Sequence, residues 1–161
     1  MFEPHYYLKL PRPVAAEYFV GLVDGELVAH LAVTPRFEIK GFRATRLVVM
    51  PEWQGAGVGT RFLNWVCAFH KAGGGRRGKE FPTYFHTSHP QLVQFLKRSK
   101  DWRQVSAVMN GGNKAKSAAS IKKTYRAGLH GGGMAAPSIG YGGHFRAVQG
   151  FKFIGPALPK P

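Results

Sequence analysis

The chain has 161 residues, a length typical of one domain and sufficient to bury a hydrophobic core. Its 23 Lys and Arg against 8 Asp and Glu give a formal net charge of +15, which favours a polyanionic partner. One Cys excludes a disulfide framework and a Cys-rich metal site, and 13% aromatic residues argue against a disordered chain. No apolar run reaches the roughly 18 residues of a membrane-spanning helix, and the first residues lack the order of a signal peptide. We therefore expect a cytoplasmic protein with no membrane partner.

Three strands are predicted in the first third of the chain. Residues 16–23 are β-prone and end at Asp24-Gly25, a dipeptide typical of a tight hairpin turn, so residues 26–34 are expected to return as the partner strand. Residues 42–50 predict the third strand, which a proline ends.

Two helices and two more strands are predicted in the rest. Apolar side chains at helical spacing indicate a helix over residues 60–72, which three glycines end. Residues 80–87 predict a strand, and Ser88 is expected to cap a helix that Pro90 opens and that runs to about residue 97. Residues 144–154 predict the last strand. This order indicates an α/β or α+β fold with a mixed sheet in a single domain, 1–161.

A long basic segment separates the second helix from the last strand. Residues 97–161 hold 12 of the Lys and Arg and a single acid, and residues 110–143 are rich in Gly, Ser, Ala and Lys, which predicts a long mobile loop. Its cations interleaved with Tyr125 and Tyr141 are typical of a segment that tracks phosphates and stacks on bases, although a solvated loop that serves solubility is the alternative. The expected nucleic-acid-binding residues are Arg43, Arg46, Lys114, Lys116, Lys122, Lys123 and Arg126.

A glycine-rich turn joins the third strand to the first helix, and it is the most informative segment of the chain. It reads QGAGVGT over residues 54–60, with glycines at alternate positions that permit a tight turn and close backbone approach. Consecutive amides at a helix N-terminus bind anions such as a pyrophosphate. No Lys-Ser/Thr follows, so the segment is not a P-loop, and its spacing is not that of the dinucleotide fingerprint. A turn without function is the alternative.

This turn resembles the signature (Q/R)-x-x-G-x-(G/A) of the GNAT acetyltransferase superfamily, and the preceding RLVVMPEW resembles the family's approach to it. The resemblance extends over about residues 14–97. It implies a GNAT fold with a mixed central sheet flanked by helices, and acetyl-CoA as the cofactor. It also implies that the amides of residues 55–60 hold the pyrophosphate and that the backbone of residues 48–50 pairs with the pantetheine arm. The implied cofactor-binding residues are Val48, Val49, Met50, Gln54, Gly55, Ala56, Gly57, Val58, Gly59 and Thr60.

Shorter segments resemble a narrower group. HYYL at residues 5–8, TSHPQL at 87–92, KDWRQV at 100–105 and the end from Arg146 to Gly155 resemble GNAT-like proteins of phages and mobile elements, including Mom-type DNA modification proteins. This resemblance implies an enzyme that modifies DNA bases in anti-restriction, with DNA favoured over RNA as partner, in the cytoplasm of the host.

The sequence departs from the family at the acid–base residues. Many members carry a Glu on the strand before the turn and a Tyr on the later helix, whereas this strand offers Arg43, Thr45 and Arg46 and this helix has Phe95 and Leu96. Either proton transfer has moved to other residues or the chemistry differs from plain amine acetylation. His titrates near neutral pH, and the candidates in reach by fold analogy are His5, Tyr6, Tyr7, His30, His86 and His89. Of these, His5, Tyr7, His86 and His89 are the expected catalytic residues.

The remaining candidates have structural interpretations. His30 lies among apolar neighbours and is expected in the core or on a sheet face, and Cys67 is expected to be buried and inert. His70, His130 and His144 are expected at the surface or in loops. Arg46 shares a strand face with Val48 and either faces the acceptor or is a solvated edge charge. No His pair has the spacing of metal ligands on one helix face, so no metal site is expected.

Two other functions stay open. An N-acetyltransferase acting on a protein lysine or a small amine would need the missing acid–base pair, and the charge of +15 would repel a cationic substrate. A non-catalytic nucleic-acid-binding protein that kept the fold is the other alternative, against which the intact glycine turn argues.

Overall fold

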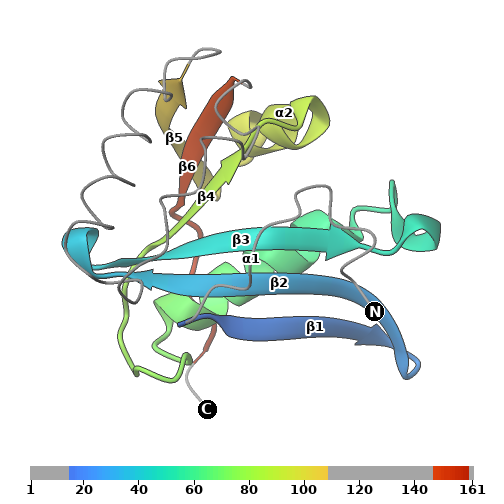
Figure 1. Ribbon diagram of the computed structural model, residues 1–161, viewed down its shortest axis with the longest axis horizontal. Helices are drawn as coiled ribbons and strands as arrows, with labels where there is room; N and C mark the ends of the chain where they lie inside the picture. Colours follow the sequence, from blue (N-terminus) through green and yellow to red (C-terminus); the bar gives the residue numbers. More distant parts are fainter. Residues whose placement is uncertain (1–14, 109–146, 160–161) are drawn as a thin grey trace, which may run out of the picture.

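The computed structural model describes residues 15–108 and 147–159 of the chain. Within these residues, six strands in the order β1-β2-β3-β4-β6-β5 form one mixed sheet, in which only the β3–β4 pair is parallel (Figure 1). The elements in chain order are β1 (Glu17–Val23), β2 (Glu26–Arg36), the 3₁₀ turn η2 (Phe37–Ile39), β3 (Gly41–Val49), the 3₁₀ turn η3 (Pro51–Trp53), α1 (Val58–Lys71), β4 (Thr83–Thr87), α2 (Pro90–Arg98), β5 (Trp102–Val108) and β6 (Val148–Phe153).

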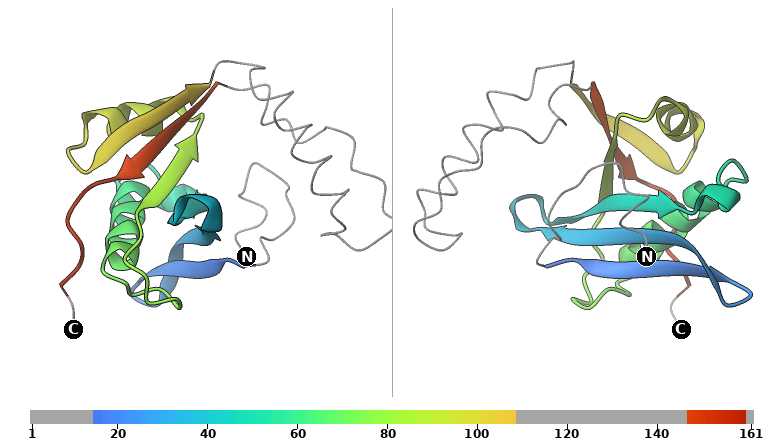
Figure 2. Two further views of the ribbon diagram at one scale, coloured as in Figure 1. Left: turned by 90° about the vertical axis from the view of Figure 1, so that its left-hand side faces the viewer. Right: turned by 45° about the vertical axis from the view of Figure 1, so that its right-hand side comes forward.

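Both helices cover the same face of the sheet, as Figure 2 shows. Leu63 and Val66 of α1 and Leu96 of α2 are buried against large apolar side chains of the strands, because each helix is apolar along one stripe. The strand residues of this core are Leu31, Val33, Phe42, Ala44, Phe85, Trp102, Phe151 and Phe153. The opposite face carries no helix of the described chain, and we call it the helix-free face. No helix of the described residues is long and apolar enough to cross a membrane.

The predicted hairpin, third strand and two helices are confirmed, with local corrections. Asp24 (φ 50°) and Gly25 (φ 83°) form the tight turn. β4 begins at Thr83 rather than at residue 80, since Pro82 has no N–H for a sheet ladder, while its carbonyl accepts the Phe42 N–H at 2.9 Å. Ser88 is not the cap of α2, whose N-cap is His89.

One strand was not predicted, and one buried residue was placed wrongly. β5 was not predicted because an irregularity between Gln104 and Ser106 interrupts the alternation of its side chains between the two faces of the sheet. His70, expected at the surface, is fully buried among the rings of Phe19, Phe42 and Phe69.

Several expectations concern other parts of the chain. The loop predicted over residues 110–143 lies outside the described residues, and so do the first three residues, 144–146, of the predicted last strand. The same holds for His5, Tyr7, Lys114, Lys116, Lys122, Lys123 and Arg126.

Candidate functional site

The glycine turn connects β3 to α1 in a conformation that depends on its glycines. Gly55 (φ 82°) and Gly57 (φ 76°) are left-handed, a region that a side chain disfavours. The Gln54 amide Nε2 donates to the Val49 carbonyl at 2.9 Å and ties the turn to the end of β3. Gly57 is the N-cap of α1, so the helix begins at Val58, two residues earlier than predicted.

The first turn of α1 presents backbone amides that no side chain caps. The Thr60 hydroxyl donates a hydrogen bond to the Gly57 carbonyl at 2.9 Å and does not accept one from a backbone N–H of the helix start. The first backbone bond of the helix runs from the Arg61 N–H to the same carbonyl, at 3.1 Å. The amides of Val58, Gly59 and Thr60 therefore precede the helical ladder, and together with the helix dipole they can bind an anion.

Gly59 differs from Gly55 and Gly57 in its role, because it lets α1 approach β3 closely. A Cβ at this position would lie 2.8 Å from Val49 Cγ2, closer than carbon atoms approach without repulsion. The absence of a side chain lets the first turn of the helix rest on the strand end. The residues present thus fit a pyrophosphate with an extended arm running along β3.

β3 and β4 part beside this turn. They pair only through Phe42–Thr83, Arg43–Tyr84 and Ala44–Phe85, after which β3 continues to Val49 and β4 to Thr87 and the two ribbons diverge (Figure 1). We call this divergence beyond Ala44 and Phe85 the fork. Strand edges that part in this way can pair with an extended ligand.

A β-bulge at Arg46 bends β3 at the fork. Between the pairs His30–Val48 and Ala32–Thr45, β3 has one more residue than β2, and Arg46 has a φ of 55°. The bulge changes the predicted alternation of β3. Thr45 and Val48, rather than Arg46 and Val48, pair with Ala32 and His30, which alternate residues place on one face of β2. His30 Nδ1 lies 3.3 Å from the Arg46 carbonyl oxygen and its ring stacks on Tyr18, in agreement with a sheet-face role.

His86 is the first residue of β4 beyond the fork. It alternates with Thr83, Phe85 and Thr87, which are buried toward the helices, so its side chain lies on the helix-free face. Its Nδ1 is buried without a hydrogen-bond partner. Burial, and then the positive charges of Arg43 and Arg36, lower the pKa of His86 to about 4. At neutral pH the ring is uncharged and can accept a proton.

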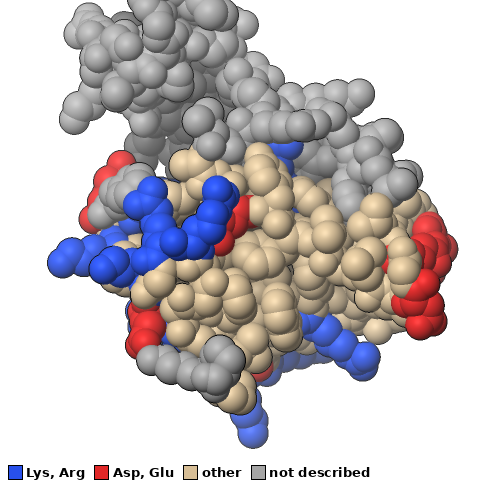
Figure 3. Space-filling model, turned by 90° about the horizontal axis from the view of Figure 1, so that it is seen from below, with Lys and Arg blue, Asp and Glu red and all other residues tan. Residues whose placement is uncertain are grey.

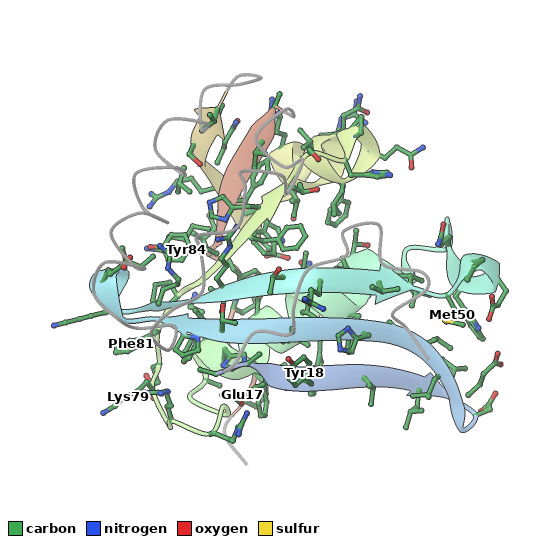
Figure 4. All side chains as sticks on the ribbon, viewed as in Figure 1. Glu17, Tyr18, Met50, Lys79, Phe81 and Tyr84 are labelled. Carbon is green, nitrogen blue, oxygen red and sulfur yellow. The ribbon has the colours of Figure 1, made fainter. Side chains whose placement is uncertain are left out.

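A row of cations crosses the helix-free face next to His86. Register places Arg43 opposite Tyr84, Tyr84 opposite Lys152, and Lys152 opposite Arg103, on four neighbouring strands. The Lys152 Nζ lies 6.0 Å from the centre of the Tyr84 ring, and Figure 4 shows Tyr84 between β3 and β6. With inter-strand steps of about 4.8 Å, this cationic row is about 14 Å long.

Further cations gather at one end of the molecule. Arg76, Arg77 and Lys79 are exposed in the loop between α1 and β4. Figure 3 shows Lys and Arg crowded at the left end, where this loop lies, with some acidic side chains among them, and a group of acidic side chains at the right end. The charge is therefore unevenly distributed over the described surface, which would orient a polyanion.

Of the four expected catalytic residues, only His86 and His89 can be placed. His89 is exposed at the start of α2, and its backbone N–H donates to the Thr87 hydroxyl at 3.1 Å. His86 alone of the two lies at the fork. Cys67 is buried, and burial raises the pKa of its thiol, in agreement with an inert residue. Lys152 and Arg103 were missed because only strand register aligns them with Arg43.

Comparison with known proteins gives one consistent result. The model of the acetyltransferase (GNAT) family matches residues 2–83. No curated protein matches the sequence.

Solved structures of acetyltransferases share the fold. The chain is similar to an IAA acetyltransferase from Bacillus cereus, with 13% identity over 86% of this chain and 77% of that chain and a TM-score of 0.53. A mutant of spermidine N-acetyltransferase SpeG from Vibrio cholerae has 12% identity over 88% and 66%, with a TM-score of 0.54. A GNAT family acetyltransferase from Elizabethkingia anophelis with acetyl-CoA bound has 12% identity over 86% and 74%, with a TM-score of 0.50.

Proposed function

Because the chain belongs to the acetyltransferase (GNAT) family and acetyl-CoA is its co-substrate, we propose that this acyltransferase modifies an amino group on a base of DNA. The observation that carries the proposal is the cationic row on the helix-free face, directly beside the fork. The finer expectation of a Mom-type modification in phage anti-restriction is part of this proposal, and it is supported by the short sequence segments that resemble such proteins.

The glycine turn and β3 would hold the co-substrate. Amides of residues 55–60 would bind its pyrophosphate, because glycine geometry and the uncapped start of α1 leave them available. The backbone of Val48, Val49 and Met50 would pair with the pantetheine arm along the fork. Acetyl-CoA supplies the activated acyl group as a thioester.

The cationic row would bind the acceptor. Lys152 and Arg103 stand directly opposite each other, a pairing of like charges that destabilises a sheet. A phosphate backbone along the row would relieve this repulsion and release counterions, so the unfavourable pairing supports a polyanionic ligand. The cations Arg43 and Arg46 were predicted to bind nucleic acid, and Arg43 lies in the row.

His86 would perform the proton transfer. The amino nitrogen attacks the thioester carbonyl carbon, a C–N bond forms, and the C–S bond breaks. His86 takes the proton that the nitrogen loses and returns it to the thiolate, which leaves as the coenzyme A thiol. The low pKa keeps the His86 ring in its neutral, proton-accepting form at pH 7, and a weakly basic amino group is also neutral at this pH, so it needs no prior deprotonation, unlike an alkylammonium ion.

The competing function is acetylation of a protein lysine or a small amine. The likeness to a spermidine N-acetyltransferase structure favours it, whereas the cationic row would repel a polyamine. The experiment that tests the proposal therefore also includes spermidine and a lysine peptide as possible acceptors.

The test is a mass analysis of nucleosides. DNA incubated with the full chain and acetyl-CoA, or taken from cells that express the chain, is digested to nucleosides; we expect one base to gain the mass of an acyl group. Gly57→Trp, which obstructs the glycine turn, is the negative control. Unmodified nucleosides together with acetylated peptide or spermidine would refute the DNA acceptor, and modified RNA with unmodified DNA would correct the partner.

The non-catalytic alternative has its own outcome. DNA binding with no transfer to any acceptor, although acetyl-CoA raises the melting temperature, would favour a binding protein that kept the co-substrate site.

A further inference from the structure

The outer edge of β1 has none of the features that usually protect the edge of a sheet. β1 is the first strand in the sheet order, and among the described residues only β2 pairs with it. Natural edge strands commonly carry charges, prolines or bulges that prevent further pairing. From Tyr18 to Val23, β1 has no charged residue and no proline, whereas β5, at the other edge, carries Arg103 and a bulge at Val105. β1 can therefore accept a further strand.

Apolar side chains are exposed along this edge on the helix-free face. Tyr18, Val20 and Leu22 alternate along β1, and they are 47%, 51% and 59% exposed. Single apolar residues on a surface are common, but these three form a row along an unpaired strand. The row is therefore suited to burial beside another apolar strand.

Aromatic side chains of α1 line the same edge on the helix side. The Phe19 ring of β1 meets the Phe69 ring edge-on at 5.8 Å, and Trp65 stacks on Phe69 at 5.5 Å while 48% of Trp65 stays exposed. Farther along β1, a Cβ on Gly21 would lie 3.6 Å from the Phe62 ring. α1 thus runs antiparallel to β1, and the exposed Trp65 lies beside the middle of the strand.

The β1–β2 hairpin is acidic in a strongly basic chain. Residues 15–35 hold three acids and no Lys or Arg, although the whole chain has 23 Lys and Arg and 8 acids. Two of these acids, Asp24 and Glu26, are exposed at the end of β1. This end would attract a basic partner.

The start of β1 is basic. The Arg76 guanidinium donates to the Ala16 carbonyl at 2.8 Å, and the Arg76 backbone N–H donates to the Glu17 carboxylate at 3.1 Å, which fixes a cation beside the strand and offsets the charge of Glu17. Arg77 and Lys79 are exposed in the same loop. Figure 3 views the molecule from the side of β1 and shows the uncharged middle between the end with most Lys and Arg and the acidic end.

We propose that β1 pairs antiparallel with β1 of a second copy of this chain, about a two-fold axis at Val20. Antiparallel pairing places the basic end of each copy beside the acidic end of the other, and the symmetry makes this contact twice. Parallel pairing would bring like charges together. The net charge of +15 opposes association only weakly here, because the potential of distant cations is screened over about 8 Å at physiological salt.

The register follows from the same symmetry. Val20 stands opposite Val20 of the partner subunit, and Tyr18 stands opposite Leu22 of the partner subunit, so the apolar row is paired along its length. The cation held at the Ala16 carbonyl lies next to Asp24 of the partner subunit. Trp65 lies near the axis and meets Trp65 of the partner subunit, an aromatic contact typical of the centre of an interface.

The dimer has a consequence for the whole assembly. A two-fold axis perpendicular to the sheet leaves both helix-free faces on one side of a continuous twelve-stranded sheet, six strands from each copy. Both cationic rows then face the same side. The pairing itself needs neither acetyl-CoA nor DNA, so it goes beyond the proposed function and can be tested without it.

The first test measures the mass of the full chain by sedimentation equilibrium. We expect twice the 17.7 kDa of one chain at about 100 μM, a concentration above the micromolar dissociation constants of weak interfaces. Val20→Lys should weaken the dimer at least about 100-fold, because two like charges meet at the axis. Val105→Lys is the matched control, since Val105 is 46% exposed on the other edge strand. A dimer that Val20→Lys leaves intact would overturn the proposal.

The second test reads the register by cross-linking. Cys67 is buried, so Val20→Cys provides the one accessible thiol among the described residues. Residues directly opposite across an antiparallel pair have Cα atoms about 4.5–5.5 Å apart, within the range of a disulfide. Leu22→Cys is the control, because its two copies would be about 13 Å apart. With diamide as oxidant, Val20→Cys should form a covalent dimer and Leu22→Cys should not; equal cross-linking would overturn the two-fold axis at Val20.

The third test concerns the charges and the other possible occupants of the edge. Asp24→Asn with Glu26→Gln should weaken the dimer about 10-fold, since exposed ion pairs are individually weak and each occurs twice. Glu38→Gln, at another exposed acid, should not. A monomeric wild type would overturn the proposal. Slow hydrogen exchange of the β1 amides in that monomer would assign the edge to another segment of the same chain.

Discussion

Gly59→Ala tests whether the close approach of α1 to β3 forms the anion site. The new Cβ would lie 2.8 Å from Val49 Cγ2, whereas carbon atoms pack at about 3.5–4.0 Å, so the first turn of α1 must move by about 1 Å. Overpacking costs about 1–3 kcal/mol, and the higher helix propensity of Ala returns about 1 kcal/mol. We expect a net loss of about 0–2 kcal/mol in the free energy of unfolding.

The effect on acetyl-CoA should exceed the effect on stability. Amides displaced by about 1 Å lose most of one hydrogen bond to a charged group, worth about 1.5–3 kcal/mol, or at least 10-fold in affinity. Calorimetric titration with acetyl-CoA measures the affinity, and urea unfolding measures the stability. The matched control is Gly25→Ala, which lies in the hairpin turn with φ 83° and open space around it; it should lose stability and keep affinity. Unchanged affinity in Gly59→Ala would refute the assignment of the turn.

Three other substitutions test separate parts of the structure. His70→Leu removes two buried ring nitrogens without partners, each costing about 1–3 kcal/mol, so urea unfolding should show a variant at least as stable as the wild type at pH 8. Burial lowers the pKa of His70 below 6.5, against a smaller opposing effect of Glu17, so the wild type should lose stability as the pH falls below about 6.5 and the variant should lose less; equal slopes would contradict this. Arg43→Ala should raise the pKa of His86, because Arg43 helps to lower it, and should move the acidic limb of kcat/KM to higher pH, while an unmoved limb would exclude His86 as the base. Arg103→Gln should reduce the salt dependence of DNA binding by about one unit of slope and slightly raise stability by ending the repulsion with Lys152; an unchanged slope would remove Arg103 from the interface.

Local chemistry predicted the elements whose signals lie in a few adjacent residues. The Asp24-Gly25 turn requires two positive φ angles that these residues tolerate, so the hairpin could be read from the chain. The glycines of the turn likewise predict its left-handed positions and the helix that follows. The same turn carries the family resemblance that the comparison confirmed.

Errors arose where the environment, rather than the pattern, decides. His70 looks like a polar residue near a helix end, yet three aromatic rings enclose it, and only packing from β1 and β3 reveals that. β5 has a bulge that disrupts its period of two. Neither feature leaves a signal in the neighbouring residues.

The sequence by itself determined the hairpin, the anion-binding turn and the charge excess, because each depends on backbone conformations or ionisable groups that residue identity fixes. Only the tertiary structure decided that β3 and β4 part after Ala44 and that Arg43, Tyr84, Lys152 and Arg103 form a row. The reason is that strand register couples residues distant along the chain, and a single extra residue, as at Arg46 or Val105, changes which side chains face each other.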